Sequence, residues 1–502
     1  MPPHSDRIVH DNLNGRVTCS HLEMALIKSS TFGRLGRIQQ LGMCSSVFPG
    51  ASHTRAAHSI GVMHAVGRFA AHLSLQQEER ELLRLGGLLH DIGQYPLSHC
   101  IELAYRAMGD SSQTAALIEN PEALATINTD MSLLQRISKM QPSAGQAKDK
   151  AIGSKIVLER TEITSLLSEL GEKDSTFIEK LAELIAGTQA DSLHQQILNS
   201  DYDCDRLDYV RRDGVATGVD YGHFDFEFLV ENFIITHDPP TSSNRVIAIE
   251  ESKGLAALEQ YLLARYNMYS QIIFHKTVRS LELQAKAAYV GLAEAGKVYR
   301  SYLEVAAVAG ASREYLAFDD SYFWSKLAAH QDDPSVPEDV RKTIRRVLDR
   351  RPLHLAYEYK TIADRSADPS YGLLLKLNFH QAQLEAVASE ARVDWRKIII
   401  DVVPPVEFVP GEKDIPADQF QRYLDDQAAG LFNENEMLRS IQLAPRVWDG
   451  DKTRLMTSRP GSLLGRMIGK RLWMIRFYLD SDDTDDLDRV ASALKHWCRV
   501  SA

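Results

Sequence analysis

The segment from Glu78 to Ile92 constrains the fold of this chain most, because it predicts a helix with one strongly apolar side. Its apolar residues recur at helical spacing at Leu82, Leu85, Leu88, Leu89 and Ile92. The helix closes with His90-Asp91, and Gly93 follows, as glycine commonly does at the end of a helix. Ionisable groups are costly to bury unless they are paired or bind a metal. The segment therefore predicts a buried helical core with a polar site at the end of one helix.

The composition is that of a globular protein with room for two to four domains. The 502 residues are 44% apolar and 25% charged, and five scattered cysteines fit a reducing compartment better than a disulfide scaffold. No apolar run approaches the roughly 18 residues of a membrane span, and the first residues lack signal-peptide features. We therefore expect a cytoplasmic protein without membrane contact. The net charge of −11 does not support nucleic-acid binding, unless positive charge is focused locally.

Helical patterns dominate the first part of the chain. They run from Arg55 to about Leu75, resume from about 153 to 213, and continue from 253 to about 350. Residues 110–150 are rich in Ser, Ala, Gln and Asn and predict an insertion. Phe233–Thr236 and Arg245–Glu250 are β-rich and flank two prolines, which predicts a small β-hairpin. We therefore expect residues 1–370 to form a mainly helical core.

The pattern changes after residue 370. Strands are predicted at Leu373–Leu377, Lys397–Val403 and Arg471–Leu479, and a closing helix at Asp485–Val500. We therefore expect residues 371–502 to form a smaller C-terminal α+β lobe. The expected fold class of the whole chain is mainly α, with the hairpin and this lobe as its β parts.

Two further segments bring histidine and aspartate toward the polar end of the apolar helix. His53 and His58 precede that helix, and Asp203–Tyr209 lies further along the chain. Imidazoles and carboxylates from separate helices form a mixed nitrogen and oxygen set that suits Mn, Fe, Mg or Zn. The alternative is a set of core histidines and helix-surface carboxylates, and spacing alone leaves both interpretations open. The same dipeptide at His10-Asp11 and His237-Asp238 lies in a polar loop and a turn, which favours no site there.

Four ordered blocks of the sequence resemble the HD-domain dNTP triphosphohydrolases. The blocks are Gln39–Gly42 with Phe48–Val62, His90–His99, Asp203–Asp213 with Thr217–Gly222, and Leu263–Tyr269 with His275-Lys276. Together they fall within about residues 7–290, and the C-terminal lobe matches only loosely. The chain is similar above all to the bacterial HD phosphohydrolases and to the sterile-alpha-motif/HD enzyme of animals.

The resemblance implies a helical HD fold and a reaction. Water would hydrolyse a deoxynucleoside triphosphate at the α-phosphorus and release deoxynucleoside and triphosphate. The resemblance also suggests a homo-oligomer, with a dNTP as the substrate. The implied ligands of the divalent metal ion are His58, His90, Asp91 and Asp205.

The resemblance further implies roles for the flanking residues. His99 matches the family histidine near the leaving 5′-oxygen, and Glu102 matches its supporting carboxylate, which together suit a general acid. Positions that contact phosphate are matched by Arg55, Arg206 and Arg265. Positions that hold the 3′-hydroxyl and crowd C2′ are matched by Gln40, Leu41, Tyr209 and Asp213. Leu41 and Tyr209 would fit equally well as core residues, and His99 as the cap of a turn.

The chain departs from the family pattern at two places. Gln94 and Tyr95 stand where the family has histidine and glycine, and glutamine can contact phosphate but cannot shuttle a proton. The family's His-Glu pair falls at Lys150-Ala151, beyond the expected insertion. Two alternatives therefore stay open. One is an HD hydrolase that has shifted to another nucleotide or a phosphodiester, and the other is a nucleotide- or nucleic-acid-binding regulator with little turnover.

Overall fold

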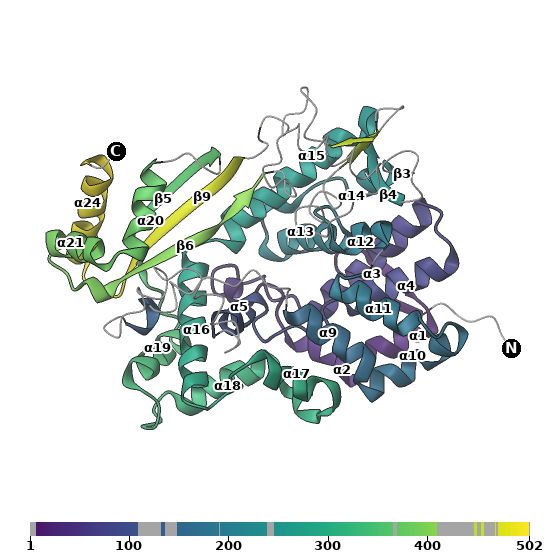
Figure 1. Cartoon of the computed structure of the whole chain (residues 1–502), viewed down its shortest axis with the longest axis horizontal. Coiled ribbons are helices and arrows are strands. Elements are labelled where there is room, and N and C mark those ends of the chain that lie inside the picture. Colours follow the sequence, from purple (N-terminus) through teal and green to yellow (C-terminus); the bar gives the residue numbers. More distant parts are fainter. Residues whose placement is uncertain are drawn as a thin grey trace, which may run out of the picture.

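The computed structural model describes residues 7–108, 132–135, 148–189, 191–237, 245–364, 369–408, 446–448, 453–455, 467 and 470–500. Helices account for most of these residues, which confirms the mainly α fold predicted from the sequence. A body of packed helices adjoins a lobe that contains a three-stranded sheet (Figure 1). Within the described ranges, no helix is both long and apolar enough to cross a lipid bilayer.

Three helices form the centre of the body. α3 (Arg55–His72) packs against α4 (Gln77–Leu89) and against α13 (Cys204–Thr217). Thr54 caps α3 and Asp203 caps α13, since each side chain accepts a hydrogen bond from a backbone N–H of the first turn. Gly61 lies where α3 and α13 approach each other, and a Cβ there would lie 2.1 Å from an Asp208 oxygen. Glycine therefore permits the close approach of these two helices.

The predicted apolar helix is α4, and it buries its leucines as expected. The helix ends at Leu89, so that His90 and Asp91 stand just beyond its last turn. Around the centre lie α5 (His99–Met108), α9 (Lys148–Glu159), α15 (Glu251–Met268) and α16 (Lys276–Glu294), with a π-helical turn at Tyr269–Ile273 between the last two. The remaining helices of the body are α1 (His21–Ile27), α2 (Ser30–Gly33), α10 (Thr161–Lys173), α11 (Phe177–Ala186), α12 (Ser192–Asn199), α14 (Phe226–Glu231), α17 (Tyr302–Ala311), α18 (Asp320–His330) and α19 (Glu338–Leu348).

Two small sheets border the body. β1 (Arg7–Asp11) and β2 (Gly15–Cys19) form an antiparallel pair. β3 (Phe233–His237) and β4 (Arg245–Glu250) pair antiparallel, which confirms the predicted hairpin. β4 also pairs in parallel with β7 (Arg446–Trp448), which pairs in turn with β8 (Thr453–Leu455).

The C-terminal lobe contains β5 (His354–Asp364), β6 (Ile398–Glu407) and β9 (Lys470–Leu479), in the antiparallel order β5-β9-β6. α20 (Pro369–Phe379), α21 (Gln381–Ala391) and α24 (Thr484–Val500) pack with the sheet around Ile398, Ile400 and Ile475 (Figure 1). Side chains alternate between the two faces of a strand. On the other face of the sheet, Val403 and Met474 therefore form a separate apolar cluster with three aromatic residues of the body, Tyr266, Tyr269 and Phe274. The sheet therefore links the lobe's own core to the helical body.

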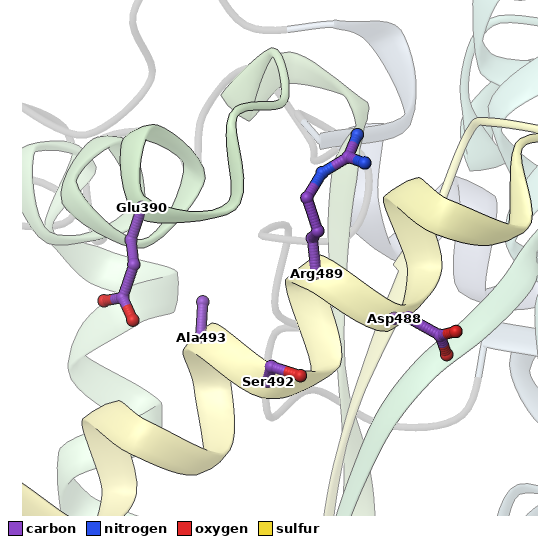
Figure 2. Close-up of a pocket in the computed structure, with 5 residues that line it drawn as sticks. All are labelled: Glu390, Asp488, Arg489, Ser492 and Ala493. Atoms are coloured by element: carbon purple, nitrogen blue, oxygen red, sulfur yellow. The ribbon is translucent and has the colours of Figure 1, made fainter.

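α21 and α24 lie side by side at the edge of the lobe. A pocket of about 280 Å³ lies between them, lined by the five residues drawn in Figure 2. Arg489 Nε donates a hydrogen bond to the carbonyl oxygen of Ala391 at 2.9 Å, and this bond ties α24 to the end of α21.

Two predictions about local structure were wrong. Leu373–Leu377 was predicted to be a strand but lies in α20, because Leu374 and Leu377 are three residues apart and both are buried in the lobe's core on one helical face. His10-Asp11 lies in β1 rather than in a loop.

Two other predictions remain open. Of the predicted insertion 110–150, residues 110–131 and 136–147 lie outside the described residues. The domain division at residue 370 stays a prediction, and β5, which begins at His354, already belongs to the C-terminal sheet.

Candidate active site

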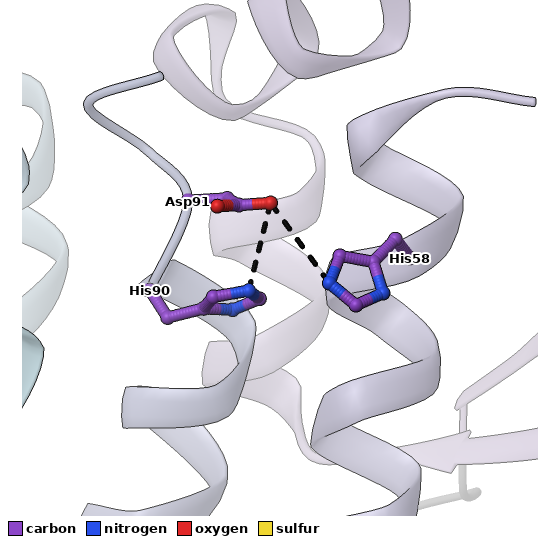
Figure 3. Close-up of side chains that lie close together, drawn as sticks. All are labelled: His58, His90 and Asp91. Atoms are coloured by element: carbon purple, nitrogen blue, oxygen red, sulfur yellow. Dashed lines mark ion pairs between the residues drawn. The ribbon is translucent and has the colours of Figure 1, made fainter. Parts of the chain in front are cut away.

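The structure brings the four predicted metal ligands together from three helices. His58 lies on α3, His90 and Asp91 follow α4, and Asp205 lies in the first turn of α13. His58 Nε2 lies 3.0 Å from Asp205 Oδ1 and 4.0 Å from Asp91 Oδ2. His90 Nε2 lies 3.5 Å from Asp91 Oδ2 and 3.8 Å from Asp205 Oδ1. Figure 3 shows both imidazoles turned toward the Asp91 carboxylate.

The other nitrogen of each imidazole is held by a partner outside this group. Nδ1 of His58 lies 2.8 Å from Asp208 Oδ2, and Nδ1 of His90 lies 2.8 Å from the carbonyl oxygen of Gly87. If Nδ1 carries the proton in both bonds, each Nε2 presents its lone pair to the carboxylates. His90 Nε2 is buried and has no hydrogen-bond partner among the described residues. Two imidazole nitrogens and two carboxylates in this arrangement fit a divalent cation.

A row of buried, alternating charges stands behind His58. Arg212 donates from Nε to Asp208 Oδ2 at 2.8 Å and from Nη2 to Asp208 Oδ1 at 3.0 Å. The same guanidinium donates to both carboxylate oxygens of Asp11 in β1, at 2.7 and 3.0 Å. Arg212 and Asp208 are almost completely buried. This row fixes the Asp208 carboxylate and, through it, the orientation of the His58 ring.

Arg55 holds Asp91 from the opposite side. Its Nη1 donates to Asp91 Oδ2 at 2.8 Å, and its Nε donates to Ser98 Oγ at 3.0 Å. Burial disfavours ionisation of Asp91, but Arg55, His90 and His58 outweigh it and keep the pKa of this carboxyl well below its usual range. Asp91 is therefore a carboxylate, as a metal ligand must be.

These residues border a cavity of about 430 Å³. The predicted site residues that line it are Gln40, Leu41, Arg55, His90, Asp91, Gln94, His99, Glu102, Asp205, Tyr209 and Asp213. His58 lies fully buried behind the wall. Arg206 and Arg265 are not among the lining residues. Arg206 Nη1 donates to Asp203 Oδ2 and to the carbonyl oxygen of Ser200, and the Arg265 guanidinium lies 5.1 Å from the centre of the Tyr269 ring.

His99 and Glu102 form a pair in the first turn of α5. His99 Nδ1 lies 2.7 Å from Glu102 Oε2, and Glu102 is 3% exposed whereas the His99 side chain is 69% exposed. Leu97 and Ser98 just before the helix have positive φ angles of 49° and 55°, a conformation that is strained for residues other than glycine. Partial desolvation by the cavity walls disfavours the charged imidazole although its edge stays exposed, but the hydrogen bond and charge of Glu102 outweigh this effect and raise the pKa of His99. His99 is therefore held by one nitrogen while its other nitrogen remains available to the cavity.

The predicted sugar-binding residues also line this cavity. Asp213 Oδ1 lies 2.8 Å from His53 Nε2, and the Tyr209 hydroxyl lies 3.2 Å from that of Tyr269. Gln40 has a buried Oε1 without a partner among the described residues. Leu41 places an apolar side chain on the same cavity. The set therefore combines polar atoms with an apolar wall.

Asp149 is a cavity residue that the sequence did not reveal. Gln94 Nε2 donates to Asp149 Oδ2 at 3.1 Å, and Asp149 Oδ1 is buried without a partner among the described residues. Burial and the nearby Glu102 raise the pKa of Asp149. Lys150, which stands where the family's His-Glu pair falls, also lines the cavity and donates a hydrogen bond to Asn199. The available signal was that Asp149 shares a helical face with the buried Ile152 and Ile156.

A second wall of the cavity was also missed, and we call it the opposite wall because it contains none of the candidate metal ligands. It consists of Tyr269, Ile273 and Phe274 at the π-helical turn, with Arg279 and Glu282 on α16. π-helical turns occur frequently at functional sites. Arg279 and Glu282 are three residues apart on a helix that is otherwise largely buried, and this was the signal in the sequence.

A second group of carboxylates and histidine lies away from the cavity. Glu79, Asp191 and His194 come close together, with His194 Nε2 at 3.2 Å from Glu79 Oε1. Arg245 Nη2 contacts Glu79 at 2.5 Å and Asp191 at 3.3 Å. The Arg245 guanidinium already neutralises these two carboxylates, so we interpret the group as an ion-pair network.

Residues 55–210 match the family model of the HD domain. This chain contains an HD domain. The matched segment contains all four candidate metal ligands, and it begins at Arg55 and ends one residue after Tyr209. The resemblance inferred from the sequence blocks is therefore confirmed.

Several proteins are similar to parts of this HD-domain chain. The uncharacterized protein YwfO of Bacillus subtilis is 32% identical over 263 residues, which cover 51% of this chain and 49% of that protein. The deoxynucleoside triphosphate triphosphohydrolase SAMHD1 homolog of Dictyostelium discoideum is 26% identical over 298 residues, or 57% of this chain and 49% of its own. SAMHD1 of Bos taurus is 40% identical over 103 residues, or 19% of this chain and 18% of its own. The chain thus spans about half or less of the length of these relatives.

One solved structure shares the fold over almost the whole chain. It is the crystal structure of a hypothetical protein from Aquifex aeolicus, with a TM-score of 0.63 and 22% sequence identity. The match covers 98% of this chain and 100% of that protein. The fold of this chain, from its helical body to its C-terminal lobe, therefore occurs in another protein of known structure.

Proposed function

We propose that this protein is a metal-dependent hydrolase that converts deoxynucleoside triphosphates to deoxynucleoside and triphosphate. The observation that carries the proposal is the convergence of the Nε2 atoms of His58 and His90 with two carboxylates beside a cavity that also holds the His99–Glu102 pair. Similarity to proteins named deoxynucleoside triphosphate triphosphohydrolase supports the choice of substrate. In keeping with that similarity, we include a homo-oligomer in the proposal, which analytical ultracentrifugation tests.

The metal-ligand set would act at the phosphate end of the substrate. His58, His90, Asp91 and Asp205 would hold a divalent cation such as Mn, Mg, Fe or Zn, which supplies Lewis-acid chemistry and helps to ionise water. Arg55 lines the cavity with a fixed guanidinium and faces the same end. Its charge would orient phosphate oxygens, while Arg206 and Arg265, which do not line the cavity, would add positive charge from further away.

His99 would deliver the proton to the leaving 5′-oxygen. Glu102 holds Nδ1, so the proton would come from Nε2, which is exposed to the cavity. The raised pKa of His99 keeps a larger fraction of the imidazole protonated at neutral pH, which a general acid requires. Gln94 would donate a hydrogen bond to the substrate or to Asp149, but it transfers no proton.

The sugar set would distinguish deoxyribose from ribose. Gln40, Tyr209 and Asp213 offer polar atoms to a 3′-hydroxyl, and Leu41 offers an apolar surface to C2′. A hydroxyl pressed against that surface would lose its hydrogen bonds with water. Deoxynucleotides should therefore be preferred.

The test is product analysis with purified protein. The chain is incubated with Mn²⁺ and each dNTP, NTP and dNMP in ¹⁸O-labelled water, and products are separated and weighed by mass spectrometry. We expect deoxynucleoside and triphosphate, with the label in triphosphate, because attack occurs at the α-phosphorus. Nucleoside di- or monophosphate products would contradict the proposal and favour an HD hydrolase with a shifted substrate. Nucleotide binding without any product would favour a regulator with little turnover.

A further inference from the structure

A pair of oppositely charged side chains on α16 belongs to the opposite wall of the cavity. Arg279 and Glu282 both line the cavity, with side chains that are 13% and 22% exposed. Arg279 Nη1 lies 3.6 Å from Glu282 Oε2, which is too long for a hydrogen bond. Among the described residues, the Glu282 carboxylate and Nη1 of Arg279 make no hydrogen bond. The pair therefore offers an acceptor and a donor side by side.

The C-terminal lobe fixes the donor in place. Arg279 donates from Nη2 to Asp401 Oδ1 at 2.7 Å and from Nε to Asp401 Oδ2 at 3.2 Å. Asp401 lies on β6 and is buried. A guanidinium bound at two nitrogens presents its third nitrogen in a fixed direction. Nη1 is consequently preorganised toward the cavity.

The pair lies beside the parts of the cavity assigned to the nucleoside. The Cys100 thiol lies 3.6 Å from the backbone oxygen of Glu282, and Cys100 directly follows His99. Cys44 packs in one apolar cluster with Leu41 of the sugar set and lines the same cavity as Glu282. Phe274 and Ile273 add apolar surface to the same wall, and the Arg279 guanidinium lies 5.8 Å from the centre of the Phe274 ring. Flat apolar surface beside paired polar groups suits a nucleobase.

We propose that Arg279 and Glu282 read the Watson–Crick edge of the base and select guanine. Guanine presents two adjacent donors, N1–H and the N2 amino group, next to the acceptor O6. Glu282 would accept from both donors, and Nη1 of Arg279 would donate to O6. The inference rests on the proposed function, because it places the base of a dNTP at this wall.

The other bases fit the pair less well. Adenine and cytosine each offer one amino donor beside a ring acceptor, which would face a carboxylate oxygen. Thymine offers a single N–H flanked by two carbonyl oxygens, one of which would face Glu282. A buried polar site rejects a ligand that leaves its groups unpaired. Guanine alone among the four matches two acceptors and one donor.

The experiment is competition among the four dNTPs, with Mn²⁺, at pH 8. Wild type should consume dGTP with a kcat/KM at least about tenfold above that of dATP. Glu282→Gln places an amide N–H₂ against the guanine donors, so it should reduce this ratio to about threefold or less. Glu294→Gln on the same helix is the matched control and should keep the wild-type ratio. Equal consumption of dGTP and dATP by wild type, or an unchanged ratio in Glu282→Gln, would overturn the inference.

A binding measurement separates this inference from the proposed function. If no dNTP is hydrolysed, the proposed function fails, and the thermal shifts produced by dGMP and dAMP still test the base site. A larger shift with dGMP that disappears in Glu282→Gln supports the inference, and equal shifts reject it. Asp401→Asn is a second variant, because it loosens Arg279 without changing the atoms that would touch the base. It should weaken the dGMP preference, and retention of the full preference would show that the lobe does not position Arg279.

Discussion

The two walls of the cavity are built in different ways. The metal wall draws its four candidate ligands from α3, α13 and the end of α4, all within residues 55–210. The opposite wall combines the π-helical turn and α16 with Asp401 of the C-terminal sheet. The metal wall is rich in charges that hold one another, whereas the opposite wall leaves one donor and one acceptor without hydrogen bonds among the described residues. The difference teaches that catalysis and substrate selection can reside on separate surfaces of one cavity.

The strongest test of the comparison removes a metal ligand. Asp205→Ala should purify as a folded protein with greatly reduced bound metal, and its turnover of every substrate should fall to background, because one of four ligands is lost. Metal is measured by elemental analysis and folding by circular dichroism. Asp208→Asn should have a smaller effect, since it keeps the four ligands and weakens the carboxylate that holds His58 Nδ1 and Arg212. We expect metal affinity to fall about 10- to 100-fold. Wild-type metal content in Asp205→Ala would remove Asp205 from the ligand set.

The next largest effect concerns proton delivery. His99→Ala should lower kcat by about 10²- to 10⁴-fold, because general acid catalysis contributes that much, while nucleotide binding stays within a few-fold. Single-turnover kinetics and equilibrium binding measure the two quantities separately. Glu102→Gln should lower kcat by a smaller factor, because it weakens the hydrogen bond that holds His99 Nδ1. Full activity of His99→Ala would show that another group, with Asp149 as the nearest alternative, donates the proton.

A smaller effect is expected at the sugar. Leu41→Gly removes the apolar surface and should narrow the preference for dGTP over GTP. A hydroxyl without partners costs about 1–3 kcal/mol, which corresponds to roughly ten- to a hundred-fold in rate. The measurement is the ratio of kcat/KM for the two nucleotides, and Leu41→Val is the control that keeps the surface. Equal turnover of dGTP and GTP by wild type would count against this sugar pocket.

The smallest effect is a pH dependence of base selection. Burial raises the pKa of Glu282 to about 7, although Arg279 opposes the shift, and Asp401, His99 and Lys286 are the other charged groups that act on it. Because the pKa of this carboxyl is raised, it is largely neutral below pH 7 and accepts from guanine only as it ionises above pH 7. The ratio of dGTP to dATP turnover should rise up to about tenfold between pH 6 and pH 8. In Glu282→Gln the ratio should be independent of pH, and a wild-type ratio that falls with pH would contradict the assignment.

The sequence predicted the metal wall better than the opposite wall, and the reason is the range of the interactions involved. His58, His90, Asp91 and Asp205 stand in recognisable local patterns, so their residues could be named before their geometry was known. Arg279 gains its orientation from Asp401, which is more than a hundred residues away and was predicted only to lie in a strand. Tertiary contacts of that kind leave no local pattern. Asp149 was missed for a related reason, since the register of family residues pointed to its neighbour Lys150.

The prediction of secondary structure was limited in the same way, because tertiary contacts leave no local pattern. The run around Leu374 satisfies a strand pattern as well as a helix pattern, and burial against the lobe's core selects the helix. Lys397–Val403 and Arg471–Leu479 were predicted correctly, because β-branched and aromatic residues alternate across a sheet with two covered faces.

The alternating row from Asp11 through Arg212 and Asp208 to His58 has a consequence for the order in which the site is assembled. β1 is synthesised before α13, and Arg212 follows Asp11 by about two hundred residues. Asp208 and His58 can take their final orientation only when both ends of that long segment have met. Closing such a loop costs conformational entropy that the other contacts of the core must offset. Metal binding is therefore coupled to completion of the fold, and a nascent chain that lacks α13 offers the cation only part of its site.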